Sequence, residues 1–371
     1  MGEKIKKILL VNVPVDKCNF KCSYCYIGQL KAWNKYNEDL GYLKEYDLFR
    51  KAFSKDRFGG PCFINLCAKG ETLIYPEIVK AIRIILEEGH YLEVVTNGSL
   101  TKRFEEIALF PKDLLNHLEF KFSFHYMELI RMGLIENFFN NVNMMKNAGA
   151  SFTIEMTPVD EEEEYIEDIK KTCLEHVGAL CHTTIARDDR KESIPVLSEH
   201  SFDEYCNVWS SFESPMFEFK KKIFQEHRNE FCYAGAWSLY INIITGQLSK
   251  CYGEPVKGNF YDLNNDLSYE PIGKCRLAHC YNGHALMTLG LLPDIETPYY
   301  SSIRNRICYN GTEWLSKDVR DFFETRLKDS NNRYSKSAEN KIVFKRKMSR
   351  LFSNPIRLSR QIINILFRKK K

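Results

Sequence analysis

The amino-acid sequence predicts an α/β fold with a parallel sheet. From residue 6 to about residue 187, short runs rich in β-branched and aromatic residues alternate with helix-like segments. Such alternation is typical of βα units, in which a crossover helix brings the next strand alongside the previous one in the same direction. The six runs are residues 8–13, 62–67, 92–96, 118–124, 152–156 and 181–185.

The segment between the second and third runs has helix signals at both ends. Pro76 stands where the first turn of a helix accepts proline, and Gly89 is a stop signal. Between them, Ile78, Ile82 and Ile85 recur at helical spacing. We therefore expect a crossover helix here.

Size and cysteine content limit the class of protein. A chain of 371 residues exceeds a typical single-core domain, so we expect a large domain and a smaller one. Residues 1–7 lead directly into a strand-like run, without the apolar stretch and cleavage site of a signal peptide. We therefore expect the 13 cysteines to be reduced, in a cytoplasmic protein. No stretch reaches the ~18 uninterrupted apolar residues of a membrane span.

The positive charge is concentrated at the C-terminal end. Residues 341–371 contain eleven Lys or Arg and no Asp or Glu, interleaved with aliphatic and a few aromatic side chains. A basic amphipathic segment of this kind predicts binding to an anionic membrane surface, with Pro355 dividing it into two helices. Nucleic acid is not the expected partner, because proteins that bind nucleic-acid strands present more aromatic side chains than this segment has. A solvated, disordered tail is the alternative.

Three cysteines follow the first run on one short loop. Cys18, Cys22 and Cys25 can hold three irons of a four-iron cluster and leave the fourth iron open to a substrate or cofactor. Zinc is the competing interpretation, but zinc sites close with four ligands, and no further Cys or His occurs in the next thirty residues.

The pattern Cys-x3-Cys-x2-Cys, with the aromatic Tyr24 before its third cysteine, resembles the radical S-adenosylmethionine (SAM) superfamily. In that family, the amino and carboxylate groups of SAM chelate the open iron. The resemblance implies a partial (β/α)6 TIM-type barrel that binds a [4Fe-4S] cluster and SAM. It also implies a low-potential electron donor of the flavodoxin or ferredoxin type, and chemistry on loops at the C-terminal ends of the strands.

A second motif follows the second run. Gly70 and Glu71 are similar to the family's Gly-Gly-Glu-Pro element, whose backbone and glutamate receive the SAM ammonium group. Lys69 and Thr72 depart from that element. The match at Glu71 therefore supports the assignment more than the match of the surrounding backbone does. Taken alone, Gly70 could be a turn and Glu71 an acid at a helix start.

Further candidate residues for SAM binding stand at later strand ends. Thr96 and Asn97 match another family turn at the cofactor, and Ser123 stands where the family places a small polar residue. Strand alternation puts His125 on the face of Ser123, where it could meet the substrate or be hydrogen-bonded within the scaffold. Arg187 could pair with the SAM carboxylate, or with Asp188 or Asp189.

A second cysteine set lies downstream. Cys232, Gly246 and Cys251 obey Cys-x13-Gly-x4-Cys, which resembles the start of the SPASM or twitch extensions of radical SAM enzymes. There a β-hairpin carries two ligands of an auxiliary iron-sulfur cluster, and a later cysteine pair completes it. Cys275 and Cys280 are that pair here.

Four cysteines suit one auxiliary [4Fe-4S] cluster, so the resemblance favours the shorter twitch form. The gap between Cys275 and Cys280 is wider than usual, which leaves Cys308 as a possible replacement for either and His279 as a further ligand. Structural zinc is the alternative. The expected domains are the barrel (1–200), the SPASM/twitch-like domain (201–310), a helical linker (311–340) and the basic tail (341–371).

The resemblance implies an enzyme that cleaves SAM to a 5′-deoxyadenosyl radical and removes hydrogen from a substrate carbon. An auxiliary cluster that accepts the substrate electron would make the reaction an oxidation. A thiol that returns hydrogen would make it an epimerisation, and Cys67 is the candidate, with a buried structural cysteine as the alternative.

The substrate is less defined than the chemistry. The basic tail suggests a glycan or another envelope precursor met at the inner face of the membrane. A peptide-modifying maturase is the second candidate, less favoured because the barrel begins within ten residues of the start. A candidate of another class is a non-catalytic zinc protein recruited to membrane or nucleic acid.

Overall fold

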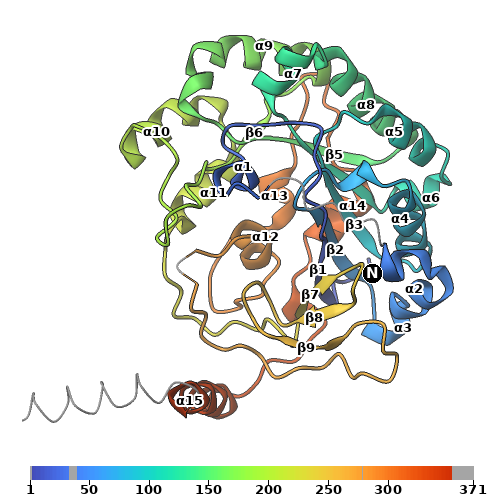
Figure 1. Ribbon diagram of the computed structural model, residues 1–371, viewed down its shortest axis with the longest axis vertical. Helices are drawn as coiled ribbons and strands as arrows, with labels where there is room; N and C mark the ends of the chain where they lie inside the picture. Colours follow the sequence, from blue (N-terminus) through green and yellow to red (C-terminus); the bar gives the residue numbers. More distant parts are fainter. Residues whose placement is uncertain (1, 33–39, 278, 353–371) are drawn as a thin grey trace, which may run out of the picture.

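The strands form one open sheet in the order β6-β5-β4-β3-β2-β1-β7-β8-β9 (Figure 1). This computed structural model describes residues 2–32, 40–277 and 279–352. The strands are β1 (Lys7–Val13), β2 (Cys62–Ala68), β3 (Tyr91–Thr96), β4 (Leu118–Ser123), β5 (Ser151–Met156), β6 (His182–Thr183), β7 (Ser238–Asn242), β8 (Gln247–Ser249) and β9 (Val256–Asn259).

The six runs expected from the sequence are confirmed as β1 to β6, and each neighbouring pair among them is parallel. The last is shorter than expected, because only His182 and Thr183 pair with β5. The edge strands β6 and β9 do not pair with each other, so the parallel part is a partial barrel.

Helices surround the barrel strands (Figure 1). The expected crossover helix is confirmed as α4, with Ile78, Ile82 and Ile85 fully buried. The α-helices are α1 (Tyr26–Gln29), α2 (Tyr46–Ala52), α3 (Lys55–Phe58), α4 (Glu77–Glu87), α5 (Thr101–Ala108), α6 (Lys112–Leu115), α7 (Tyr126–Met132), α8 (Ile135–Ala148), α9 (Ile166–Val177), α10 (Phe202–Trp209), α11 (Pro215–Ile223), α12 (Gly283–Thr288), α13 (Tyr300–Arg304), α14 (Lys317–Phe323) and α15 (Lys336–Phe352).

The two faces of the barrel strands differ in polarity. On β4, Phe120 and Phe122 point outward and pack against Phe104 of α5, and Phe122 also meets Phe138 of α8. The alternate residues of the same strand are polar, and two of them, Lys121 and Ser123, line a cavity on the inner face. Alternation along a strand therefore gives an apolar outer face for the helices and a polar interior.

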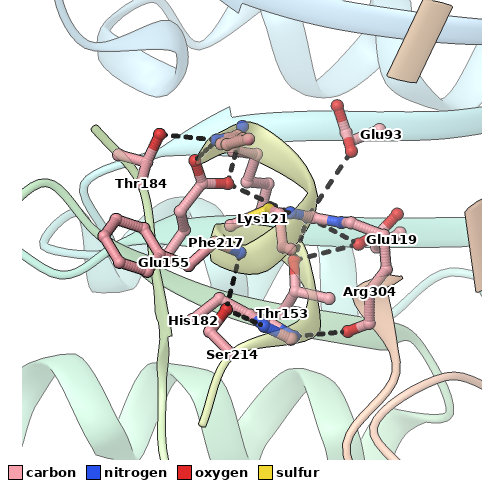
Figure 2. Close-up of polar contacts among 12 residues, drawn as sticks. Glu93, Glu119, Lys121, Thr153, Glu155, His182, Thr184, Ser214, Phe217 and Arg304 are labelled. Carbon is pink, nitrogen blue, oxygen red and sulfur yellow. Dashed lines mark hydrogen bonds and ion pairs between the residues drawn. The ribbon is translucent and has the colours of Figure 1, made fainter. Parts of the chain in front are cut away.

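Charged side chains inside the barrel meet at one arginine (Figure 2). Arg304, at the end of α13, is fully buried and lies 3.0 Å from Glu119 Oε1, 3.0 Å from Glu155 Oε2 and 3.5 Å from Glu93 Oε2. It also donates to the hydroxyl of Thr153. Burial raises the pKa of Glu119 to about 7, although the charge of Arg304 opposes the rise. One cation therefore joins β3, β4 and β5.

The C-terminal helices close the barrel at the N-terminal ends of its strands. Phe63 of β2 packs edge-on against Tyr300 and Phe323, and Tyr91 of β3 stacks on Phe322 with 3.7 Å between ring centroids. These rings belong to α13 and α14. Residues from β2 and β3 thus share an apolar core with the last third of the chain.

The expected hairpin in the downstream half is confirmed, and it extends the barrel sheet. β7 pairs in parallel with β1, and β8 pairs antiparallel with β7. Gly246 makes the turn at a φ of +73°, where a Cβ would meet Asn259 Oδ1 at 2.2 Å.

Helix α15 lies along the downstream half of the protein. The hydroxyl of Tyr233 donates to Glu339 at 2.7 Å, Ile342 is buried, and Arg346 pairs with Glu254. Phe344 is exposed, and the rest of the expected basic tail, including Pro355, lies outside the described residues. In the described parts of the chain, no helix combines the length and the apolar composition needed to cross a membrane.

Replacing Arg304 with Met should strongly destabilise the protein, by about 3–5 kcal/mol, because it leaves buried carboxylates without their cation. The control is Arg83→Met, which removes a half-exposed pair with Glu87 and should cost no more than about 1 kcal/mol. Urea unfolding of both variants, in the same cofactor-loaded state, measures the difference. Equal midpoints would contradict a stabilising role for Arg304.

Candidate active site

A cavity of about 840 Å³ opens at the C-terminal ends of the barrel strands. The loop that carries Cys18, Cys22 and Cys25 forms part of its wall. Residues of α11, α12 and the downstream cysteine set also line the cavity. The cavity therefore lies where barrel enzymes place their chemistry.

Two backbone hydrogen bonds tie the cysteine loop to the end of β2. Gly70 N donates to Val15 O at 2.6 Å, and Glu71 N donates to Lys17 O at 3.0 Å. A Cβ on Gly70 would stand 2.1 Å from Lys17 O, so only glycine allows this approach. The expected Gly-Glu motif thus positions the segment that leads into Cys18.

Side chains from the turn after β3 hold the same loop. Asn97 Nδ2 donates to Asn19 Oδ1 at 2.8 Å, and Asn19 Nδ2 donates to Ser99 Oγ at 2.8 Å. Asn97 Nδ2 also lies 3.7 Å from Cys18 Sγ. The Asn-Gly turn expected at the cofactor is therefore a clamp on the cysteine loop.

The three thiols of the loop are held away from water. Cys22 is buried and Cys18 and Cys25 are half-buried. Burial raises the pKa of Cys18 to about 11 and raises the pKa of Cys22 and Cys25 as well. A metal that binds here must displace the thiol protons, so binding releases protons to solvent.

Glu71 is a buried carboxylate without a cationic side chain beside it among the described residues. Its Oε1 accepts from Leu73 N at 2.9 Å and from Thr96 Oγ1 at 2.7 Å, and its Oε2 accepts from Asn97 N at 2.8 Å. Burial raises its pKa against these hydrogen bonds. Glu71 lines the cavity, where a ligand ammonium would supply the missing charge.

His125 makes a hydrogen bond within the site. Its Nδ1 lies 2.6 Å from the hydroxyl of Tyr24, and its ring also packs edge-on against Phe20. Burial lowers the pKa of His125 to about 4, so the ring is neutral at pH 7. The histidine therefore orients Tyr24 within the cysteine loop. His125, Tyr24 and Ser123 all line the cavity.

Arg187 faces the downstream half. Its Nε lies 3.9 Å from Asp189, its Nη1 lies 3.5 Å from His279 Nε2, and its guanidinium covers the ring of Tyr281 at 5.3 Å. Asp188 pairs instead with Arg190. Arg187 thus lies against the segment that leads into Cys280.

The downstream cysteines Cys232, Cys251, Cys275 and Cys280 gather in one place. Backbone bonds pair Cys232 with Gly273, which brings the third cysteine segment beside the first. Burial raises the pKa of Cys251 to about 12, and the charge of Cys275 adds to the rise. Cys280 also lines the main cavity, so this set borders the same space as the upstream loop.

Two alternative ligands considered for this set lie elsewhere. The thiol of Cys308 donates to Val177 O at 3.1 Å and packs on Gly178, so Cys308 belongs to the core near α9, and the suggestion that it replaces a ligand is wrong. His279 Nε2 lies 3.5 Å from Arg187 Nη1, and its Nδ1 is buried with no hydrogen-bond partner among the residues that the structure describes.

Several cavity residues were missed by the sequence reasoning. Asn65, Lys121, Glu155, Lys220 and His284 line the interior. Part of the signal was present in the alternation of charged and apolar residues along β4 and β5. Lys220 and His284 come from helices far along the chain and carry no comparable pattern.

Comparison with known protein families finds a match for the first part of the chain. Residues 12–173 match the family model described as the radical SAM superfamily. This segment of the chain is therefore similar to the radical SAM superfamily. The matched region contains the cysteine loop, Gly70, Glu71 and the turn after β3. A search of curated proteins finds no match.

Solved radical SAM enzymes share limited similarity with the chain. SuiB of Streptococcus suis is 12% identical, with a TM-score of 0.47 over 70% of this chain and 64% of SuiB. Its complex with the precursor peptide SuiA is 15% identical, with a TM-score of 0.46 over 71% and 64%. AdoMet-bound anSMEcpe is 14% identical, with a TM-score of 0.46 over 95% and 100%. At these values, the similarities do not decide the reaction or the substrate.

The residues present fit the cofactors of the superfamily, a [4Fe-4S] cluster and SAM. Three thiols lie on one loop that is held by hydrogen bonds, and the carboxylate of Glu71 lines the same cavity, where it can accept from a cationic group. Gly70 keeps the close approach that a Cβ would fill. The site therefore has the ligand and anchor groups that these two cofactors require.

Gly70→Ala should abolish assembly of the upstream cluster, because the added Cβ pushes Lys17 and the cysteine loop away from Glu71. Gly133→Ala is the control: Gly133 has a φ of +66° but open space around its Cβ position, so it tests backbone strain alone. Iron content and the visible spectrum after anaerobic reconstitution measure the effect. A normal upstream cluster in Gly70→Ala would contradict the clamp.

Proposed function

We propose that this protein is a radical SAM enzyme that oxidises or epimerises a substrate carbon inside the barrel. The single observation that supports this most is the cysteine loop clamped by Gly70 and Asn97 at the wall of the 840 Å³ cavity. When bound there, cluster and SAM supply a 5′-deoxyadenosyl radical that removes hydrogen from the substrate.

We propose specific roles for the residues around the cofactor. Cys18, Cys22 and Cys25 hold the cluster, and Glu71 accepts the SAM ammonium group. Tyr24, oriented by His125, packs beside the cofactor, and Ser123 and Arg187 offer hydrogen-bond donors to its polar groups. Thr96 acts through Glu71, to which it donates.

We further propose that the downstream thiols hold an auxiliary [4Fe-4S] cluster, and that residues 201–310 form a twitch-type extension. Among the described residues, three ligating groups converge within 4.8 Å only at Asp160, Glu163 and His200. A tetrahedral zinc ion would bring its sulfur ligands about 3.8 Å apart, from a Zn–S distance of about 2.3 Å. The place of Cys280 in the wall of the main cavity, which the upstream loop also lines, supports a cluster that accepts electrons over structural zinc.

The position of the downstream set favours oxidation. Cys280 and Cys25 line the same cavity, so a substrate held there lies between the two sets. In an oxidation, a cluster held by Cys232, Cys251, Cys275 and Cys280 would supply the acceptor for the second electron that the substrate carbon loses. A flavodoxin- or ferredoxin-type donor would supply the electron that starts each turnover.

Epimerisation is the second candidate, supported by Cys67. Its thiol lines the cavity, and burial raises its pKa to about 11, so it carries hydrogen at neutral pH. In that reaction, the thiol gives a hydrogen atom to the opposite face of the substrate radical. The resulting thiyl must then take up one electron and one proton before the next turnover.

We also propose a substrate class and a location. A glycan or envelope precursor and a peptide both fit a cavity of this size, and the basic residues beyond α15 support work at the inner face of the membrane. A cytoplasmic protein without nucleic-acid partners is the setting that the composition favours.

Two cysteine variants test the cluster assignments. Cys22→Ala should abolish SAM cleavage under dithionite while the downstream iron stays bound. The matched variant Cys251→Ala should lose the downstream iron and keep the upstream iron. Reconstituted wild-type protein should contain about eight iron and eight sulfide per chain, from two four-iron clusters. Colourless protein with stoichiometric zinc, or full SAM cleavage by Cys22→Ala, would exclude the proposed enzyme.

The thiol variant Cys67→Ala separates the two reactions. Deuterated candidate substrates first identify the compound that transfers deuterium into 5′-deoxyadenosine. In deuterium oxide, an epimerase should then place one solvent deuterium in the product. The variant Cys67→Ala should no longer form that product. The control Cys62→Ala, at the other end of β2, should still form it. An oxidised product without solvent deuterium would assign oxidation instead.

A further inference from the structure

Below the strand ends, the cavity has a floor that the SAM-binding assignments do not use. Lys121 of β4, Lys220 of α11 and His284 of α12 line it. Glu155 of β5 contacts both lysines, and Figure 2 shows it beside Lys121. The exposed fractions of the two lysine side chains are 13% and 12%, and His284 is 5% exposed. Cations this far from water need a defined acceptor.

The hydrogen-bond donors at this floor outnumber the acceptors. Lys220 Nζ donates to Glu155 Oε1 at 2.8 Å and to Thr184 Oγ1 at 2.6 Å, and Lys121 Nζ lies 2.8 Å from Glu155 Oε2. An ammonium carries three N–H donors, so Lys121 keeps two and Lys220 keeps one without an acceptor among the described residues. His284 Nε2 is buried and has no hydrogen-bond partner in the described parts of the chain.

Glu155 cannot neutralise these donors by itself. Its Oε2 also contacts Arg304 Nη1 at 3.0 Å, so one carboxylate faces three cations. Burial works against its charge, yet Lys121, Lys220 and Arg304 together hold the pKa of Glu155 well below its usual range. Arg304 is shared with Glu93 and Glu119 beneath the floor, whereas both lysines contact Glu155 and line the cavity.

The floor is separate from the cysteine loop. Along β4, Lys121 precedes Ser123 by two residues on the same face, and Ser123 is in register with Glu155. The groups that clamp the cysteine loop, Glu71 and Asn97, lie beyond the ends of β2 and β3. A molecule held at the floor therefore extends toward the loop with its free end.

We propose that Lys121, Lys220 and His284 bind an oxyanion of the substrate, a carboxylate or a phosphate group. Three unused lysine N–H donors in a water-poor pocket match such a group, and His284 adds a fourth in the tautomer that carries its proton on Nε2. Charge-assisted hydrogen bonds are the strong ones in that setting. The substrate is therefore an acid anchored at the floor, with the carbon to be attacked held nearer the cysteine loop. This inference rests on the proposed function, because it names the substrate class of the same cavity.

The test measures anion binding to the reconstituted protein with SAM present and no reductant. Acetate is followed by saturation-transfer proton NMR, and inorganic phosphate by phosphorus line broadening. We expect at least one of them to bind, with affinity reduced tenfold or more in Lys121→Gln and Lys220→Gln. The control Lys191→Gln, which alters a surface pair with Asp188, should bind as wild type does.

Either anion binding alone supports the proposal and identifies the group as a carboxylate or a phosphate. Binding of neither anion, or equal binding in the lysine variants, would overturn it. Binding that occurs only without SAM would also overturn it, because the lysines would then serve the cofactor's own carboxylate.

A second variant guards against lysine variants that do not fold. His284→Leu removes one donor and leaves the partners of Glu155 in place, so it should fold and weaken anion binding several-fold. Unchanged anion binding in His284→Leu would contradict the part of the proposal that assigns His284 to the site. The measurement involves no SAM cleavage. Failure of the proposed function would appear as absent 5′-deoxyadenosine under dithionite, whereas failure of this inference would appear as absent anion binding.

Discussion

Arg304 is the constraint on which the interior of this protein depends. Glu93, Glu119 and Glu155 come from three adjacent strands and would repel one another in a medium of low dielectric constant. A single guanidinium from α13 lies among them and makes their burial possible. The same contact ties the last third of the chain to the barrel, where Phe322 and Phe323 close the ends of β2 and β3.

The charge network also connects the core to the cavity. Glu155 contacts Arg304 on one side and the two lysines of the floor on the other. The floor can present cations to a ligand because the carboxylate between them is already held in place. The proposed oxyanion site and the stability of the core therefore draw on the same buried charges.

The two cysteine sets owe their relation to one strand pairing. β1 leads into the loop of Cys18, and β7, which follows Cys232, pairs beside β1 with Asn12 opposite Asn242. The hairpin of the downstream set thus begins as a strand of the barrel sheet. As a result, Cys25 and Cys280 border the same cavity, with the lysine floor beneath it. A substrate anchored there by an acidic group would lie between the two sites.

The sequence by itself determined the features that depend on local spacing. The three-cysteine loop, the helix α4 after Pro76, the Gly246 hairpin and the six strands follow from residues that are near neighbours along the chain. Tertiary structure decided which distant residues meet: Arg304 with Glu155, 149 positions apart, Lys220 and His284 at the floor, and Cys280 rather than Cys308 at the second cysteine set. Local patterns report backbone preference and amphipathic faces, whereas contacts between distant charges and thiols depend on how the elements pack.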